Sequence, residues 1–246
     1  MTVYHVRSGE RSWDGEAIGI LILDACYPCI PGNVGNATTY DFPVRYKEVK
    51  GASIERLLKE RDPSLVTPFI EAAQELEAEG VRAITGACGF MALFQKQVAS
   101  SVRIPVFLSS LMQVPFIIRT LPPHQQVGII TADKNCLTKD HFDSAGIHQS
   151  MPTVIYGMEG KDEFRTSILE EKGTLDSDLI EKEVTETAAL MVRENPDIGA
   201  ILLECSDLPP YAASIQETVD LPVYDFITMI NYVHSGIRRK RFKGYM

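Results

Sequence analysis

Two cysteines, Cys88 and Cys205, have the type and setting needed for proton-transfer chemistry. Each follows a short apolar segment and precedes a predicted helix. A helix N-terminus favours an anion, and the usual thiol pKa is about 8.5, so a modest decrease gives a base that works near neutral pH. Two such thiols on opposite sides of a bound molecule can remove a proton from a carbon beside a carbonyl group and return one to the other face. The neighbouring amides expected to hold a carboxylate or enolate oxygen are those of Gly89, Phe90, Ser206 and Asp207.

The two cysteines lie in two copies of one sequence plan. Segments 83–116 and 200–233 align without a gap at a spacing of 117 residues, which pairs Cys88 with Cys205. A second pair of segments, Ile18–Asp24 and 127–133, aligns at a spacing of 109 residues. Because the two blocks keep the same order in both halves, we predict two similar lobes.

Each half alternates short runs of Ile, Val and Leu with longer amphipathic stretches, which is typical of parallel strands covered by helices on both faces. We therefore predict an α/β fold of two pseudo-symmetric lobes, each a parallel sheet flanked by helices. The predicted strands are 17–24, 44–50, 83–87, 106–109, 126–132, 153–156, 200–204 and 223–226. The predicted helices are 68–79, 179–193 and 227–239.

The segment Leu121–His124 contains two prolines and predicts the boundary between the lobes. The first lobe is then residues 1–120 together with 227–246, because we expect the last helix to pack back on it. The second lobe is residues 121–226.

In open parallel sheets, ligands bind beyond the carboxyl ends of the strands, so we expect the active site in the cleft between the lobes. Asp24, Ser110 and Thr131 lie at or after predicted strand ends and are further candidates for binding substrate. Each of them is also explained as an ordinary residue at the end of a strand.

These motifs resemble the aspartate/glutamate/hydantoin racemase superfamily. The resemblance rests on Ile18–Asp24, 83–90 and 201–206, and it covers about residues 17–234. It implies a two-lobed fold, catalytic cysteines at positions 88 and 205, proton transfer without pyridoxal phosphate, and a homo-oligomer. The residues after the cysteines are Gly-Phe and Ser-Asp, whereas glutamate racemases usually have Asn-Thr and Thr-His, so glutamate is not the favoured substrate.

We predict an isomerase: a racemase or epimerase that needs no cofactor or metal and acts on an amino acid or a hydantoin-like carbon acid. The alternative within the superfamily is a cis–trans isomerase or a lyase, similar to maleate isomerases or arylmalonate decarboxylases. Arylmalonate decarboxylases keep only the second cysteine, so Cys88 argues against a simple decarboxylase. Outside the superfamily, the alternative function is a thiol oxidoreductase, because Cys26-Tyr27-Pro28-Cys29 is a C-x-x-C motif. The residues after this motif, however, indicate a loop and not a helix. The third alternative is a protein module that binds a ligand in the cleft but does not convert it.

The partner expected from this chemistry is a small-molecule carboxylate or cyclic amide. The net charge of −9 argues against nucleic acid and against an anionic membrane surface. No apolar run is long enough to span a bilayer and the first residues are polar, so we expect a cytoplasmic protein. We interpret the basic run 238–243 as the C-terminus of a helix, Cys136 as structural, and His124, His141, His148 and His234 as surface or loop residues.

Overall fold

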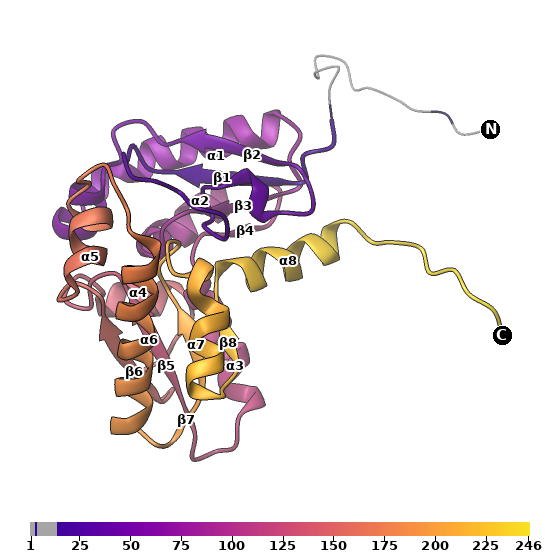
Figure 1. Ribbon diagram of the computed structural model, residues 1–246. Helices are drawn as coiled ribbons and strands as arrows, with labels where there is room; N and C mark the ends of the chain where they lie inside the picture. The colour runs from indigo at the N-terminus through magenta and orange to yellow at the C-terminus, as the bar shows by residue number, and fades with distance from the viewer. Residues whose placement is uncertain (1–2, 4–13) are drawn as a thin grey trace.

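Two parallel four-stranded sheets form two lobes that lie one above the other in Figure 1. The computed structural model describes residue 3 and residues 14–246. The first sheet has the order β2-β1-β3-β4 and contains β1 (Ile18–Ile22), β2 (Val44–Glu48), β3 (Ala83–Gly86) and β4 (Val106–Phe107). The second has the order β6-β5-β7-β8 and contains β5 (Gln126–Thr131), β6 (Thr153–Gly157), β7 (Ile198–Leu203) and β8 (Val223–Tyr224). The α/β fold and the two similar parallel sheets predicted from the sequence are confirmed.

The internal repeat extends to strand register. Ile18 pairs with Val44 in the first sheet, and the residues 109 positions later, Val127 and Thr153, pair in the second. Each central strand, β1 and β5, is almost wholly buried because it has a strand on both sides and packs against helices. The two halves of the chain therefore fold into the same local topology.

A glycine at the second position of each central strand permits the close approach of a helix. A Cβ atom on Gly19 would lie 2.9 Å from a methyl group of Leu76 on α1. A Cβ atom on Gly128 would lie 2.6 Å from the terminal methyl of Met191 on α6. The Ile-Gly and Val-Gly pairs of the repeat are thus explained by helix-on-sheet packing.

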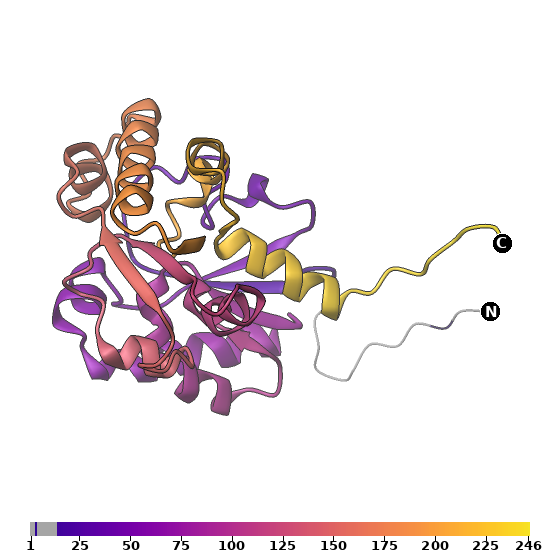
Figure 2. The ribbon, with the colours of Figure 1, turned by 90° about the horizontal axis from the view of Figure 1, so that it is seen from below.

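Helices cover the sheets and connect their strands (Figures 1 and 2). The α-helices are α1 (Val66–Ala78), α2 (Gln95–Ser101), α3 (Val114–Thr120), α4 (Lys139–Ser144), α5 (Asp162–Phe164), α6 (Ser177–Glu194), α7 (Ala212–Val219) and α8 (Phe226–Ile237). The 3-10 helices are η1 (Ala37–Thr39), η3 (Pro63–Leu65), η4 (Gly89–Phe94), η5 (Ser110–Gln113) and η7 (Pro209–Tyr211), and two π-helical turns are η2 (Glu55–Glu60) and η6 (Arg165–Leu169). Within the described residues, no helix is long and apolar enough to cross a membrane.

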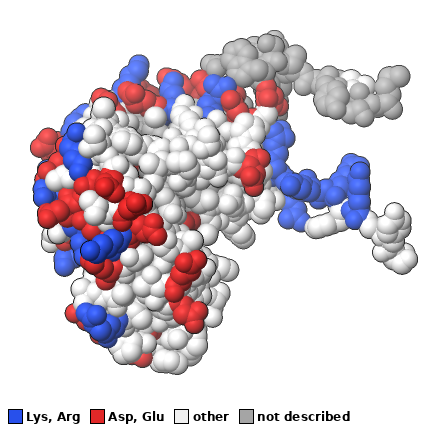
Figure 3. All heavy atoms as spheres, in the orientation of Figure 1, with Lys and Arg blue, Asp and Glu red and all other residues white. Residues whose placement is uncertain are grey.

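The last helix, α8, belongs by packing to the first sheet. Phe226, Met229 and Ile230 are buried in one cluster with Ile18 and Ile20 of β1. The helix ends at Ile237, so the basic run 238–243 follows the helix and does not form its last turn as expected. Figure 3 shows this basic segment extending away from the body of the molecule.

Two strands, β4 and β8, end earlier than the sequence predicted. The strand predicted at 106–109 stops at Phe107, and the strand predicted at 223–226 stops at Tyr224. In both places a side-chain oxygen accepts a hydrogen bond from a nearby backbone N–H group. Ser109 accepts from the N–H of Leu111, and Asp225 accepts from that of Thr228. These caps start the next helical segment and end the strand early.

Candidate active site

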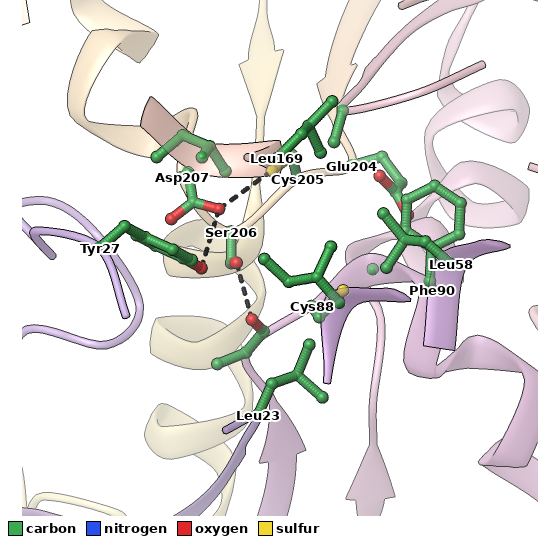
Figure 4. A pocket seen from close by; sticks show the side chains of 15 residues that line it. Leu23, Tyr27, Leu58, Cys88, Phe90, Leu169, Glu204, Cys205, Ser206 and Asp207 are labelled. Atoms are coloured by element: carbon green, nitrogen blue, oxygen red, sulfur yellow. Dashed lines mark hydrogen bonds between the residues drawn. The ribbon is translucent and has the colours of Figure 1, made fainter. Parts of the chain in front are cut away.

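A pocket with about 340 Å³ of atom-free space, its open mouth included, lies between the two lobes (Figure 4). Both predicted catalytic cysteines line it, together with four of the predicted binding residues, Gly89, Phe90, Ser206 and Asp207. The rest of the lining is Leu23, Tyr27, Ile54, Leu58, Ala87, Ala132, Ile168, Leu169 and Glu204. The pocket wall is therefore mostly apolar, and its polar groups come from the strand ends predicted from the sequence.

Cys88 is placed by the end of β3. The strand stops at Gly86, and the backbone N–H of Ala87 donates to the carbonyl of Leu21 at 2.9 Å, which ties this turn to the neighbouring strand β1. Cys88 is extended and occupies the N-cap position of the 3-10 helix η4. The backbone N–H groups of Phe90 and Met91 lower the pKa of this thiol. The N–H of Met91 itself donates to the backbone carbonyl of Cys88 at 3.1 Å.

Cys205 follows β7 in the same way but has different neighbours. Its side chain is 6% exposed, and its Sγ donates to Oδ2 of Asp207 at 3.3 Å. The predicted helix does not begin at this cysteine, because the short helix η7 starts only at Pro209. The expectation of a helix start at both thiols is therefore wrong for Cys205, whose hydrogen-bond partner is a carboxylate.

Asp207 accepts three hydrogen bonds, and two of them join the two lobes. The Tyr27 hydroxyl donates to Oδ2 at 3.3 Å, and Nδ2 of Asn33 donates to Oδ1 at 2.5 Å, in addition to the Cys205 thiol. Tyr27 and Asn33 come from the loop after β1, so the first lobe supplies two donors to a carboxyl group of the second. Hydrogen bonds that a carboxyl group accepts favour its ionised form. Burial raises the pKa of Asp207, and these hydrogen bonds lower it.

Glu204 is a pocket residue that the sequence analysis missed. It is fully buried, and burial raises its pKa to about 7. The Thr131 hydroxyl donates to Oε2 at 2.8 Å, while Oε1 has no hydrogen-bond partner. A Cβ atom on Gly89 would lie 2.0 Å from Oε1, so the carboxyl group crosses to the first lobe and lies against the residue after Cys88. Figure 4 shows the two carboxyl groups on different sides of the pocket, with Asp207 beside Tyr27 and Glu204 on the Phe90 side.

The two thiols are less acidic than the sequence predicted. Burial is the largest cause that raises the pKa of Cys88 above its ordinary value, followed by the charge of Glu204. Burial also raises the pKa of Cys205, followed by the charges of Asp207 and Glu204. The prediction of lowered thiol pKa values is therefore wrong, because burial and two carboxyl groups outweigh the backbone N–H groups.

Three predicted binding residues do not line the pocket. Asp24 is exposed at the end of the first strand region. Ser110 is buried and donates to the carbonyl of Leu203 at 2.9 Å, so it holds the end of β7. Thr131 holds Glu204, as described above. Ser206 lines the pocket, and its hydroxyl donates to the carbonyl of Ala87 at 2.7 Å, which links the two cysteine loops.

The remaining cysteines have other settings. Cys26 and Cys29 are free and exposed, and they lie in a loop, not at the helix start that a thioredoxin-like motif occupies. The backbone N–H of Cys26 donates to Oε1 of Glu171 at 2.5 Å, so this loop bridges to the second lobe beside the pocket. Cys136, interpreted as structural, lies outside the pocket, and its Sγ donates to Oδ2 of Asp133 at 3.3 Å.

His141 corrects the assignment of the histidines to surface or loop positions. It is fully buried in α4, where Nδ1 accepts from the backbone N–H of Thr138 at 3.0 Å in a capping box. Its ring packs edge-on against Phe90 with ring centroids 5.3 Å apart. His141 therefore supports a pocket wall from behind. His234 stacks on Phe42 with ring centroids 3.6 Å apart.

The pocket is lined by acidic side chains and by no basic ones. None of the lining residues is Lys, Arg or His, whereas two of them carry carboxyl groups. No group of three or more His, Cys, Asp or Glu side chains suited to a metal ion occurs among the described residues. A dianionic ligand would find no side-chain cation in this pocket, and a ligand with a positive group would find two carboxyl groups.

Sequence comparison identifies a family and named relatives. A model of the family described as Asp/Glu/Hydantoin racemase matches residues 52–230. The chain is 30% identical over 226 residues to a dimethylsulfoniopropionate lyase of Durusdinium sp. clade D, an alignment that covers 89% of the chain and 74% of the relative. It is also 30% identical over 222 residues to dimethylsulfoniopropionate lyase 7 of Emiliania huxleyi, covering 87% of the chain and 65% of the relative. The chain thus spans less than two thirds of the latter protein's length.

Solved structures share the fold. A mutant of arylmalonate decarboxylase superposes with a TM-score of 0.61 at 16% identity, covering 93% of this chain and 97% of that one. An allantoin racemase from Pseudomonas fluorescens gives a TM-score of 0.58 at 16% identity, covering 92% of this chain and 100% of that one. At these identities the likeness concerns the fold and does not specify the reaction.

Proposed function

The chain belongs to the Asp/Glu/hydantoin racemase family, and we propose that within it this chain is a lyase that eliminates a sulfide from a sulfonium carboxylate of the dimethylsulfoniopropionate type. This is the lyase alternative raised from the sequence, and the named relatives favour it over the racemase. The observation that carries the proposal is the charge of the pocket.

Dimethylsulfoniopropionate has a positive sulfonium group at one end and a carboxylate at the other. The ionised Asp207, saturated with donors and beside the Tyr27 ring, suits the sulfonium group because an ion pair and the face of an aromatic ring both attract a cation. Aspartate, glutamate and arylmalonates have two carboxylates, and the pocket offers no side-chain cation to either. The pocket therefore fits a zwitterion with one cationic end better than it fits a diacid.

The surroundings of the two thiols support unequal roles. Cys205 donates to Asp207, whereas the corresponding position of the other half, two residues after Cys88, is Phe90. An elimination needs one base, while racemisation needs two matched groups. Asp207 accepts the thiol proton of Cys205, and this pair keeps one negative charge whichever member holds the proton. The pair can therefore attract the sulfonium group and act as the base at the same time.

The reaction then runs as a β-elimination. The Cys205 thiolate takes a proton from the carbon next to the carboxylate, and that C–H electron pair forms the new C=C bond. The bond between the β-carbon and sulfur breaks, and its electron pair leaves with sulfur as neutral dimethyl sulfide. The products are acrylate, dimethyl sulfide and one proton, so the charges balance. The positive substrate also offsets the charge of Asp207, which disfavours the thiolate of Cys205.

Racemisation stays the second candidate because two thiols line one pocket. The experiment that separates the two is incubation in D2O, with one arm containing dimethylsulfoniopropionate and another containing single enantiomers of aspartate, allantoin and 5-substituted hydantoins. Release of dimethyl sulfide with equimolar acrylate supports the lyase. Exchange of the α-proton of a chiral substrate without sulfide release would replace the lyase with the racemase.

A further inference from the structure

Glu204 has the features of a group that binds a ligand directly. It is fully buried, it lines the pocket, and one of its two carboxyl oxygens has no hydrogen-bond partner. Buried polar atoms are nearly always paired, so an unpaired one that lines a pocket indicates a partner supplied by the ligand. The other oxygen is fixed by the Thr131 hydroxyl at 2.8 Å, which orients the carboxyl group.

Gly89 leaves room for this orientation because it has no side chain. The carboxyl group lies against the Cα atom of Gly89, where any side chain would clash, since a Cβ atom would approach Oε1 to 2.0 Å and the main-chain oxygen of Glu204 to 2.4 Å. Gly89 follows Cys88, whose loop presents backbone N–H groups to the pocket. The unpaired oxygen is therefore held where predicted anion-binding amides and a reactive thiol meet.

The two pocket carboxyl groups accept different numbers of hydrogen bonds. Asp207 accepts from three donors, which favour its anionic form. Glu204 accepts from one donor, has no cation beside it, and is wholly removed from water, which favours the neutral acid. One site then has a charged end for a cation and a neutral acid end for an anion. Carboxyl pairs whose environments differ in this way commonly divide the acid and base roles of an active site.

We propose that Glu204 is a catalytic carboxylic acid whose Oε1–H donates a hydrogen bond to the substrate carboxylate. This inference rests on the proposed function and assigns the binding of the substrate's anionic end. When the α-proton leaves, negative charge moves onto the carboxylate oxygens, and the hydrogen bond from a neutral acid becomes stronger at that moment. The Glu204 proton stays on Oε1 throughout, so the balance of the elimination is unchanged.

The binding test uses unreactive ligands and two variants of similar size. Glu204→Gln keeps a neutral hydrogen-bond donor, and Glu204→Met removes it. Calorimetry measures the affinity of 3-(trimethylammonio)propionate, which has the charges of the sulfonium substrate with a poor leaving group, and of propyltrimethylammonium, which lacks the carboxylate. We expect Glu204→Met to weaken the first ligand by 10- to 100-fold and to leave the second within about twofold, with Glu204→Gln near the wild type for both.

Infrared spectroscopy tests the protonation directly and needs neither turnover nor ligand. The wild type at pH 6 should show the C=O stretch of a neutral carboxylic acid that Glu204→Gln removes. This band should disappear as the pH rises through about 7, and kcat/KM should fall over the same range in the wild type but not in Glu204→Gln, because the ionised group repels the substrate carboxylate.

The outcomes separate the two proposals. Absence of dimethyl sulfide release by the wild type overturns the lyase and leaves the infrared and binding results to decide on Glu204. Equal weakening of both ligands in Glu204→Met, or no acid band at pH 6, overturns the role of Glu204 even if the lyase is active. A variant that fails to fold is recognised from its thermal unfolding, and the wild-type infrared titration then decides alone.

Discussion

The charge of Asp207 should decide which ligands the pocket prefers, and Asp207→Asn tests this with little change in shape. A cationic group in contact with the buried carboxylate, about 4 Å away, interacts with it by about 4 kcal/mol at an effective dielectric constant of 20. Desolvation of the two charges offsets roughly half of this energy. We therefore expect about 2 kcal/mol of net preference, or roughly 30-fold in affinity, to depend on this one charge.

The assay compares two ligands of the same shape in the wild type and the variant. 3-(Trimethylammonio)propionate carries the positive charge, and 4,4-dimethylpentanoate has a carbon atom in place of its nitrogen. The ratio of the two affinities should fall by roughly 30-fold in Asp207→Asn. The matched control is Asp225→Asn, which removes another buried carboxyl group, the cap of α8, outside the pocket. This control should leave the ratio unchanged.

The same variant separates thiol acidity from catalysis. Because the charge of Asp207 raises the pKa of Cys205, Asp207→Asn should lower that pKa and make the thiol react faster with iodoacetamide at neutral pH. Turnover should nevertheless fall by about 10²- to 10⁴-fold, because the proton acceptor of Cys205 is lost. An unchanged affinity ratio, or turnover that rises with thiol reactivity, would refute the reasoning that Asp207 serves as both cation site and proton acceptor.

Three further predictions follow from particular contacts. Cys205→Ser should reduce lyase turnover by a larger factor than Cys88→Ser, because only Cys205 has a carboxylate proton acceptor; equal losses in steady-state assays would favour a two-thiol racemase. Gly89→Ala should cost about 1–3 kcal/mol of stability in urea unfolding because its Cβ would meet a carboxyl oxygen at 2.0 Å, whereas the control Gly160→Ala, with nothing within 4 Å, should be neutral. Burial lowers the pKa of His141 to about 4 from 6.5, so the unfolded chain takes up a proton first as the pH falls. The wild type should lose about 3 kcal/mol more stability between pH 7 and pH 4 than His141→Gln, which keeps the capping box; a parallel loss in both proteins would contradict this assignment.

The sequence predicted the architecture because local patterning and an internal repeat determine it. Apolar runs placed eight strands near their observed positions, and the spacing of 109 residues between the blocks became equal strand register in the two sheets. Strand ends were less accurate, because a strand stops where a cap such as Ser109 or Asp225 captures a backbone N–H, and such caps depend on contacts that periodicity does not encode. The thiol positions followed from the repeat alone, since both cysteines come after equivalent strands.

The electrostatics of the site could not be predicted in the same way. The pKa of each thiol depends on which side chains of the opposite lobe approach it, and the sequence analysis considered only the neighbouring helix start. Asn33 lies in the loop after β1 and donates to Asp207 across the cleft at 2.5 Å. Interlobe contacts of this kind join residues more than 170 positions apart, and no local pattern reports them.

The internal repeat nevertheless contained a signal for these polar residues. They stand at positions where the two copies of the repeat have different residue types. At the spacing of 117 residues, Glu204 corresponds to Ala87 and Asp207 to Phe90. At the spacing of 109 residues, Thr131 corresponds to an isoleucine. All three polar replacements fall in the second half, at or just after strand ends, and the structure joins them to the pocket: Thr131 orients Glu204, and Asp207 accepts from the Cys205 thiol. A symmetric fold thus presents two equivalent thiols, and three polar substitutions on one side make their environments unequal. Unequal thiols suit an elimination, because it removes a single proton and needs one base. Two equivalent thiols would instead suit proton transfer in both directions, as in racemisation.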